Sequence, residues 1–202
     1  MSKIEKQNWD ERFSSEDYAY GTAPNVFLKE QLDKLGSGRL LMLGEGEGRN
    51  AVYAAKMNWQ VDAVDFSEQA RMKALKLAAK EKVKLNYSIS DLIEYKPEKN
   101  YYGAIGIIFI HLDKPDAEKI FTSAKDALKK GGVIICEVFS KNQLGKTSGG
   151  PKVSDLLYSL DEITGIFKGL ETISLEECSV ILNEGILHQG EAIVIRYVGK
   201  KL

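Results

Sequence analysis

The sequence predicts an α/β fold, in which helices cover both faces of a mostly parallel sheet. Three observations lead to this prediction. Five short runs of branched apolar residues recur along the chain, and stretches with helical spacing lie between them. Near the C-terminus two further strand-like runs follow each other closely, which adds an antiparallel hairpin to one edge. We therefore expect a sheet of seven strands.

The local sequence places each element in turn. Buried strands are expected at residues 39–43, 60–64, 85–89, 104–109 and 132–138, with helices at 49–57, 68–82 and 114–130. Residues 140–152 are rich in glycine and polar side chains, which indicates a loop. A last helix is expected at 156–167, and hairpin strands at 171–182 and 190–198. The turn formers Asn183, Glu184 and Gly185 lie between these two strands.

Composition indicates one ordinary globular domain over residues 1–202, because 44% of the residues are hydrophobic and 28% are charged. The 28 basic and 29 acidic residues leave a net charge of -1, which argues against nucleic acid as a partner. The longest apolar run, residues 104–110, is far shorter than the roughly 20 residues of a membrane span. Cys136 and Cys178 fit a reduced, cytoplasmic protein, and no metal site is expected.

The most specific feature is a loop with three alternating glycines, Gly44, Gly46 and Gly48, which directly follows the first strand. Glycine lets the backbone turn sharply and approach a ligand closely. The dinucleotide fingerprint would need a third glycine at position 49, where this chain has arginine. Glu45 and Glu47 would also repel phosphates. A cationic or zwitterionic ligand without phosphates therefore suits the loop best, and a ligand-free turn is the alternative.

Two aspartates end neighbouring strands at the same edge of the sheet. Asp65 follows the second strand, where a carboxylate can accept hydrogen bonds from both hydroxyls of a ribose. Asp91 follows the third strand, where it could accept a hydrogen bond from the exocyclic amine of adenine. Each has a structural alternative as a helix cap.

These residues resemble the class I S-adenosylmethionine-dependent methyltransferases over nearly the whole chain. More narrowly, the chain looks like the branch related to tellurite-resistance and thiopurine S-methyltransferases. The segments that match this branch are residues 9–13, 20–25, 45–51 and 149–152, and Glu184-Gly185 with His188.

The resemblance implies a Rossmann-like fold and S-adenosylmethionine as the cofactor. Residues 38–139 would form the cofactor-binding core, residues 1–30 a lid, and residues 140–202 the acceptor side. Many members of the class carry an acidic residue two positions before the first loop glycine, where this chain has Met42; Glu45 is then expected to contact the methionine ammonium. The implied cofactor-binding residues are Gly44, Glu45, Gly46, Gly48, Asn50, Asp65, Phe66, Asp91, Leu92, Arg12 and Trp9.

The acceptor side has fewer candidates, since the chain contains two histidines. His111 follows the fourth strand and is expected to act as a general base or to orient the acceptor. Glu137 interrupts an apolar strand and should face the cleft or a cation, because a buried carboxylate without a partner is costly. Tyr20, His188 and Gly150 are expected to contact the substrate.

The predicted function is methyl transfer from S-adenosylmethionine to a small-molecule nucleophile, with a thiol or a chalcogen oxyanion favoured. The alternatives are an RNA or protein methyltransferase, or a protein that binds the cofactor without turnover. The basic residues between positions 71 and 84 have helical spacing and are expected to form a solvated face rather than an RNA site. A monomer or a homodimer is compatible with the sequence.

Overall fold

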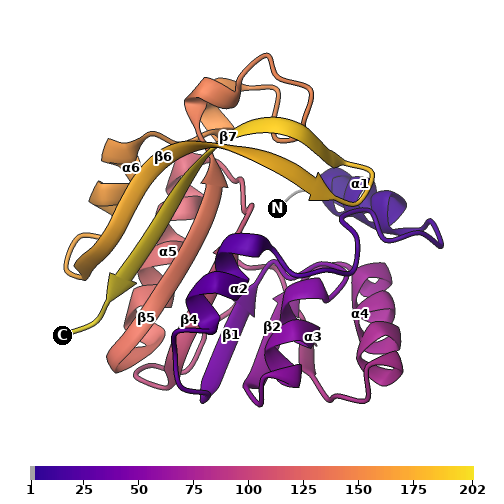
Figure 1. Cartoon of the computed structure of the whole chain (residues 1–202), viewed down its shortest axis with the longest axis horizontal. Coiled ribbons are helices and arrows are strands. Elements are labelled where there is room, and N and C mark those ends of the chain that lie inside the picture. The colour runs from indigo at the N-terminus through magenta and orange to yellow at the C-terminus, as the bar shows by residue number, and fades with distance from the viewer. Residues whose placement is uncertain (1–2) are drawn as a thin grey trace.

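The computed structural model describes residues 3–202 and shows a seven-stranded sheet with helices on both faces (Figure 1). The strands lie in the order β3-β2-β1-β4-β5-β7-β6. Strands β1 to β5 are parallel, and β7 pairs antiparallel with β5 and β6. The predicted fold class is confirmed. The strands are Arg39–Leu43 (β1), Gln60–Asp65 (β2), Asn86–Ile89 (β3), Tyr102–Ile108 (β4), Leu128–Phe139 (β5), Glu171–Glu184 (β6) and His188–Lys200 (β7).

The strand order determines where a ligand can bind. From β1 the chain proceeds outward through β2 and β3, and then returns to the other side of β1 with β4 and β5. In open parallel sheets, ligands bind beyond the carboxyl ends of the strands at such a reversal. The loops that follow β1, β2 and β4 meet at this edge.

The apolar strands are buried on both sides, as their continuous hydrophobic runs predict. Leu41 and Leu43 of β1 belong to the core under α5 (Lys114–Ala127) and α6 (Leu160–Ile166). Leu40 and Met42 belong to the opposite core, under α2 (Val26–Leu32), α3 (Arg49–Lys56) and α4 (Glu68–Lys80). Each such side chain stabilises the fold by about 1.5–3 kcal/mol.

All four predicted helices are shorter than expected, and two of them differ by three residues or more. The helix expected at 156–167 begins at Leu160, because Ser159 forms a capping box with Glu162. Residues 154–156 form a separate 3-10 turn. The helix expected to reach residue 130 ends at Ala127, and the next residue already pairs with Tyr102 in the sheet.

The hairpin is longer than predicted, which changes the place of two residues. Asn183 and Glu184, expected in a turn, continue β6, and His188 begins β7, so the turn is confined to residues 185–187. Glu184 and His188 lie directly opposite each other across the two strands. Cross-strand hydrogen bonds therefore override the local turn preference of Asn183 and Glu184.

The tip of the hairpin bends over the carboxyl edge of the sheet toward the N-terminal segment (Figure 1). The backbone N–H groups of Ile186 and Leu187 donate to the Ala19 carbonyl at 3.1 and 3.3 Å. A Cβ on Gly185 would lie 2.4 Å from that carbonyl oxygen, so this contact requires glycine. Helix α1 (Lys3–Phe13) precedes the segment. Within residues 3–202, no helix is long and apolar enough to cross a bilayer.

Candidate functional site

The glycine loop leaves β1 through three left-handed residues. The φ angles of Gly44, Gly46 and Gly48 are +57°, +63° and +90°. A Cβ on Gly48 would lie 2.6 Å from the Cβ of Ala74, so α4 packs directly on the loop. Other side chains would be strained at these angles, which is why glycine occurs at all three positions.

The Glu45 side chain turns inward and binds the start of α3. Its Oε1 accepts hydrogen bonds from the backbone N–H groups of Asn50 and Ala51 at 3.0 and 2.7 Å. Its Oε2 is buried and has no hydrogen-bond partner among the described residues. Burial raises the pKa of the Glu45 carboxyl to about 8. A cationic ligand beside the Glu45 carboxyl would therefore stabilise its charged form.

Asp65 ends β2 and holds two loops together. Its Oδ2 accepts from the backbone N–H of Gly46 at 3.0 Å, and its Oδ1 from that of Ser67 at 2.9 Å. Burial raises the pKa of Asp65 to about 6. A carboxylate has about four acceptor positions, so Asp65 retains the capacity to accept hydroxyl groups. The half-buried Phe66 follows it.

The third loop places Asp91 and Leu92 at the same edge. Asp91 Oδ1 accepts from the backbone N–H of Ile93 at 3.0 Å, which is the capping contact expected as its structural alternative. Leu92 is buried beside Ile110, and both side chains approach the position that a Cβ on Gly44 would occupy. The loop after β1 therefore borders an apolar wall.

Helix α1 covers the glycine loop from outside the sheet. The Phe13 ring lies 3.5 Å from the position of a Cβ on Gly46 and packs on Trp9 with ring centroids 5.6 Å apart. Arg12 stacks on the Trp9 ring at 4.2 Å and donates from Nη1 to the Tyr20 hydroxyl at 2.9 Å. The structure thus brings three predicted residues, Trp9, Arg12 and Tyr20, into mutual contact.

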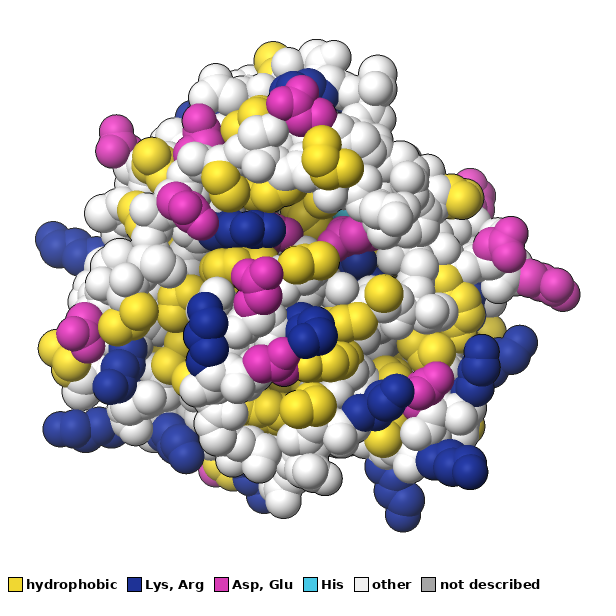
Figure 2. All heavy atoms as spheres, in the orientation of Figure 1, with side chains coloured by type: hydrophobic (Ala, Val, Ile, Leu, Met, Phe, Trp, Pro, Cys, Tyr) yellow, Lys and Arg dark blue, Asp and Glu magenta, His cyan; other side chains and the backbone are white. Residues whose placement is uncertain are grey.

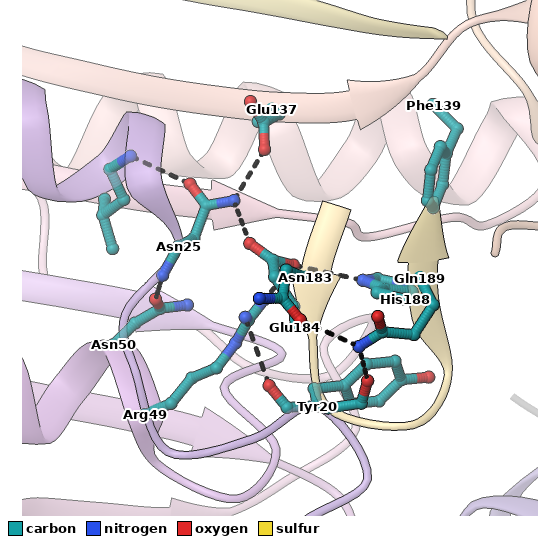
Figure 3. A network of polar contacts seen from close by, with 12 residues as sticks. Tyr20, Asn25, Arg49, Asn50, Glu137, Phe139, Asn183, Glu184, His188 and Gln189 are labelled. Carbon is teal, nitrogen blue, oxygen red and sulfur yellow. Dashed lines mark hydrogen bonds and ion pairs between the residues drawn. The ribbon is translucent and has the colours of Figure 1, made fainter. Parts of the chain in front are cut away.

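A buried polar cluster lies where the N-terminal segment meets β5 and the hairpin (Figure 3). Asn25 Nδ2 donates to Glu137 Oε1 at 2.6 Å and to Glu184 Oε1 at 3.1 Å. Arg49 Nη2 pairs with Glu184 Oε2 at 3.0 Å, and Arg196 Nε with Glu137 Oε2 at 2.6 Å. Two arginines therefore compensate two buried glutamates.

Two more of the residues predicted for the site, Asn50 and Glu137, belong to this cluster. Asn50 Oδ1 accepts from the backbone N–H of Asn25 at 2.9 Å, so it supports the cluster from α3. Glu137 faces a cation, Arg196, which is one of the two environments expected for it. Figure 2 shows basic and acidic side chains, with a histidine behind them, in a hollow between the hairpin and the helices below it.

His188 is held by Glu184 at one ring nitrogen. Its Nδ1 lies 3.2 Å from Glu184 Oε2. The pKa of Glu184 is lowered to about 2 by His188 and Arg49, which outweigh its burial. Burial lowers the pKa of His188, so the ring is neutral near pH 7 and its Nδ1 carries the proton donated to the carboxylate. Nε2 has no hydrogen-bond partner among the described residues.

Aromatic rings surround His188. The ring centroids of Tyr20, Phe109 and Phe139 lie 4.6, 4.7 and 5.4 Å from that of His188. A Cβ on Gly149 would lie 2.6 Å from His188 Cδ2, and one on Gly150 would lie 2.8 Å from Phe139. The predicted substrate residues Tyr20, His188 and Gly150 therefore gather around one aromatic cluster.

His111 lies at the same edge, but both of its ring nitrogens are engaged by the backbone. Nδ1 donates to the Leu156 carbonyl at 2.8 Å, and Nε2 accepts from the Phe139 N–H at 3.2 Å. Burial lowers its pKa to about 4. Of the two roles expected for His111, these bonds disfavour proton transfer and leave that of a positioning residue.

Sequence reasoning missed Phe109 and Phe139 as site residues. Phe109 has a φ of +54°, which is uncommon for a bulky side chain and turns its ring onto His188. Phe109 follows β4 and Phe139 is the last residue of β5, and this position at the carboxyl edge is the signal that could have identified them. The contact of Glu184 with Arg49 had no such signal, because 135 residues separate them.

Two cavities lie outside the aromatic cluster. One of about 450 Å³ is lined by Ser37, Arg39, Asn58 and Tyr101 at the opposite edge of the sheet. Another, of about 150 Å³, lies between α4 and residues 13–18. The described residues contain no group of three His, Cys, Asp or Glu side chains that could hold a metal ion.

Comparisons with known proteins agree with this geometry. Residues 40–132 match the family model of the methyltransferase domain. No curated protein matches the sequence.

Three solved structures illustrate the similarity of fold. One is a protein described in the conversion of a disulfide bond into a thioacetal group during echinomycin biosynthesis, with 15% identity, a TM-score of 0.78, and coverage of 100% of this chain and 91% of that chain. TehB from Haemophilus influenzae has 16% identity, a TM-score of 0.75, and coverage of 98% and 67%. An S-adenosylmethionine-dependent methyltransferase from Clostridium acetobutylicum has 16% identity, a TM-score of 0.67, and coverage of 98% and 93%.

Proposed function

We propose that the chain is an S-adenosylmethionine-dependent methyltransferase that methylates a small-molecule nucleophile, with a neutral thiol preferred. The match of residues 40–132 to the methyltransferase domain and the similarity of fold support this proposal. The proposal also includes the narrower relation of the chain to tellurite-resistance and thiopurine S-methyltransferases. The observation that carries it is the geometry of the His188 imidazole: its Nδ1 lies 3.2 Å from Glu184 Oε2, and its Nε2 has no hydrogen-bond partner among the described residues.

The residues of the loop fit the cofactor. The buried Oε2 of Glu45 lacks a hydrogen-bond partner among the described residues, and the methionine ammonium would supply one. Asp65 would accept the ribose hydroxyls, Asp91 and Leu92 would border the adenine, and Arg12 would lie near the methionine carboxylate. When bound, S-adenosylmethionine supplies a methyl group that its sulfonium has already activated.

The assignment of Glu45 predicts a pH-dependent affinity. Its free carboxyl has a pKa of about 8, and an ammonium partner would favour the charged form. Binding below pH 8 must then release a proton, so we expect the affinity for S-adenosylhomocysteine to fall by up to about tenfold per unit as the pH is lowered from 7.5 to 6.5. Isothermal titration in two buffers of different ionisation enthalpy measures the released proton.

Glu45→Gln is the matched control, because it keeps the size of the side chain and removes the titration. We expect it to bind more weakly and to lose the released proton. The assignment of Glu45 is wrong if wild type and Glu45→Gln release the same number of protons.

His188 is the proposed proton acceptor for the acceptor molecule. A thiol must lose its proton as its sulfur forms the new bond to carbon, and a neutral imidazole can take that proton at Nε2. The resulting imidazolium would be stabilised by Glu184 through Nδ1. His111, whose nitrogens are bound to the backbone, would hold Phe139 and the loop at residue 156 in place.

The charges of the buried cluster favour a neutral acceptor over an oxyanion. Arg49 is paired with Glu184 and Arg196 with Glu137, so neither arginine offers an uncompensated positive charge. An oxyanion would have to compete with a carboxylate that is already in place. A small thiol, by contrast, matches the aromatic surroundings of His188.

Two measurements, made one after the other, test the proposed function. Titration calorimetry with S-adenosylmethionine and S-adenosylhomocysteine should show binding well below millimolar concentration, and its absence would remove the proposal. A panel of small thiols, selenite and tellurite is then assayed for S-adenosylhomocysteine production. We expect turnover with thiols. Binding without turnover on any acceptor would instead support a non-catalytic cofactor-binding protein, and turnover with tellurite alone would reverse the proposed preference.

A further inference from the structure

One lysine of α4 does not belong to a solvated face. The sequence places Lys73 among basic residues expected to point into solvent, yet its side chain is only 13% exposed. Lys76 and Lys80, on the same helix, are exposed as predicted. Burying a long cationic side chain requires compensating partners, and Lys73 has several.

The ammonium of Lys73 joins two parts of the chain. Nζ donates to the backbone carbonyls of Ser15 and Asp17 at 2.8 and 2.6 Å, and it also pairs with Glu47 Oε1 in the glycine loop. It lies 4.9 Å from the centre of the Tyr18 ring. The Tyr18 hydroxyl in turn donates to the Lys73 carbonyl at 3.0 Å. Residues 14–21, which we call the N-terminal strap, are thus fastened to α4 and to the loop by one side chain.

We propose that Lys73 is a positioning residue of the cofactor site, which fixes the N-terminal strap and the glycine loop in one arrangement so that both receive S-adenosylmethionine together. The inference rests on the proposed function, because the loop that Lys73 holds is the cofactor loop. Lys73 itself has no assigned contact with the cofactor.

The burial of Glu47 supports this role. The Glu47 side chain is only 3% exposed, and its Oε2 has no hydrogen-bond partner among the described residues, so Lys73 provides the compensating charge. The neighbouring contact of Gly48 with Ala74 keeps loop and helix in register. Loss of the Lys73 ammonium would leave a buried carboxylate in the middle of the loop.

The other end of the strap explains why its position matters to the reaction. Ala19 accepts the two hydrogen bonds from the hairpin tip, and the Tyr20 carbonyl accepts one from Arg49 Nη1 at 3.3 Å. Tyr20 also contacts His188. The strap therefore runs from the glycine loop to the acceptor side, and Lys73 anchors its first half.

Replacement of Lys73 by methionine tests the proposal with two readouts. We expect the Kd for S-adenosylhomocysteine to rise at least tenfold, and kcat at saturating cofactor to stay within threefold. In the free protein, endoproteinase Glu-C should cleave after the exposed Glu16 at least tenfold faster, as measured by mass spectrometry. Cleavage after Glu176, on the exposed edge strand, should keep its rate and serves as the internal control for global unfolding.

Lys80→Met is the matched variant on the same helix and should behave as wild type in both assays. If Lys73→Met fails to fold, Tyr18→Phe removes the other strap-to-helix hydrogen bond without disturbing the charge of Glu47, and faster cleavage after Glu16 is expected there too. Wild-type affinity and wild-type cleavage in Lys73→Met would overturn the proposal, as would a wild-type cleavage rate in Tyr18→Phe if only that variant folds. Failure of the wild-type protein to bind S-adenosylhomocysteine would instead contradict the proposed function, since cleavage of the free protein does not depend on the cofactor.

Discussion

Replacing His188 by alanine is expected to lower kcat for a small thiol at pH 7 by about 10²–10⁴-fold, the range typical of general acid–base catalysis. Nε2 of the imidazole has no hydrogen-bond partner among the described residues and lies at the aromatic cluster, and the Glu184 carboxylate accepts from Nδ1. Removal of the imidazole deprives the thiol of a proton acceptor. Affinity for S-adenosylhomocysteine should stay within threefold, because the proposed function places His188 beside the acceptor and not beside the cofactor. Steady-state kinetics and titration calorimetry measure the two quantities separately.

The pH profile distinguishes proton transfer from packing in the same variant. Without a base, the rate depends on the fraction of thiolate, which increases about tenfold per pH unit until the ordinary thiol pKa of about 8.5. The activity of His188→Ala should therefore recover toward pH 9, whereas that of the wild type should vary less. His188→Phe preserves the ring packing and should show the same recovery. A variant that is equally impaired at every pH would show that His188 only packs.

The largest effect on stability is expected from Glu184→Ala, which should lower the free energy of unfolding by about 3–5 kcal/mol. Glu184 is the shared partner of Arg49, Asn25 and His188. Its truncation leaves the Arg49 guanidinium buried without a counter-charge and two further donors without an acceptor. Glu184→Gln should lower the free energy of unfolding by a smaller amount, since the amide oxygen of glutamine can still accept a hydrogen bond.

Urea unfolding at pH 7 measures this difference. Glu176→Ala is the control on the same strand, because Glu176 is exposed, and it should change stability by less than about 0.5 kcal/mol. Equal effects of Glu184→Ala and Glu176→Ala would show that the buried ion pair contributes nothing to stability.

Acid titration gives an independent check on Glu184. Its pKa is about 2 in the folded protein and about 4.5 in the unfolded chain, so its contribution is complete above pH 4.5 and is lost as the pH falls toward 2. The stability difference between wild type and Glu184→Gln should therefore shrink over that interval. A constant difference would contradict the lowered pKa.

Much of the fold was predictable because hydrophobic period and turn chemistry act locally. Residues 39–43 and 60–64 were predicted as strands from their apolar runs, and the structure extends only the second, by one residue. Local preference was misleading where distant pairing dominates. Asn183 and Glu184 favour turns, but their pairing with Gln189 and His188 across the hairpin keeps them in β6.

The candidate site likewise contains features that the sequence predicts and features that depend on the folded chain. The glycine loop and Asp65 could be assigned from sequence because a strand end, a left-handed glycine and a capping carboxylate are features of adjacent residues. The choice between the two histidines could not be made from the sequence. His111 and His188 both lie near strand ends, and only the folded chain brings the Phe139 N–H to one and the Glu184 carboxylate to the other.

The sequence by itself therefore determined the α/β class and the position of the glycine loop, and it predicted the kind of cofactor. These follow from short-range patterns that one segment carries alone. Tertiary structure decided which charges compensate one another, that Lys73 is largely withdrawn from solvent, and which histidine nitrogen lacks a partner among the described residues. The physical reason is that burial and pairing depend on groups far apart in sequence: Asn25 meets Glu184 across 159 residues, and Lys73 meets Ser15 across 58.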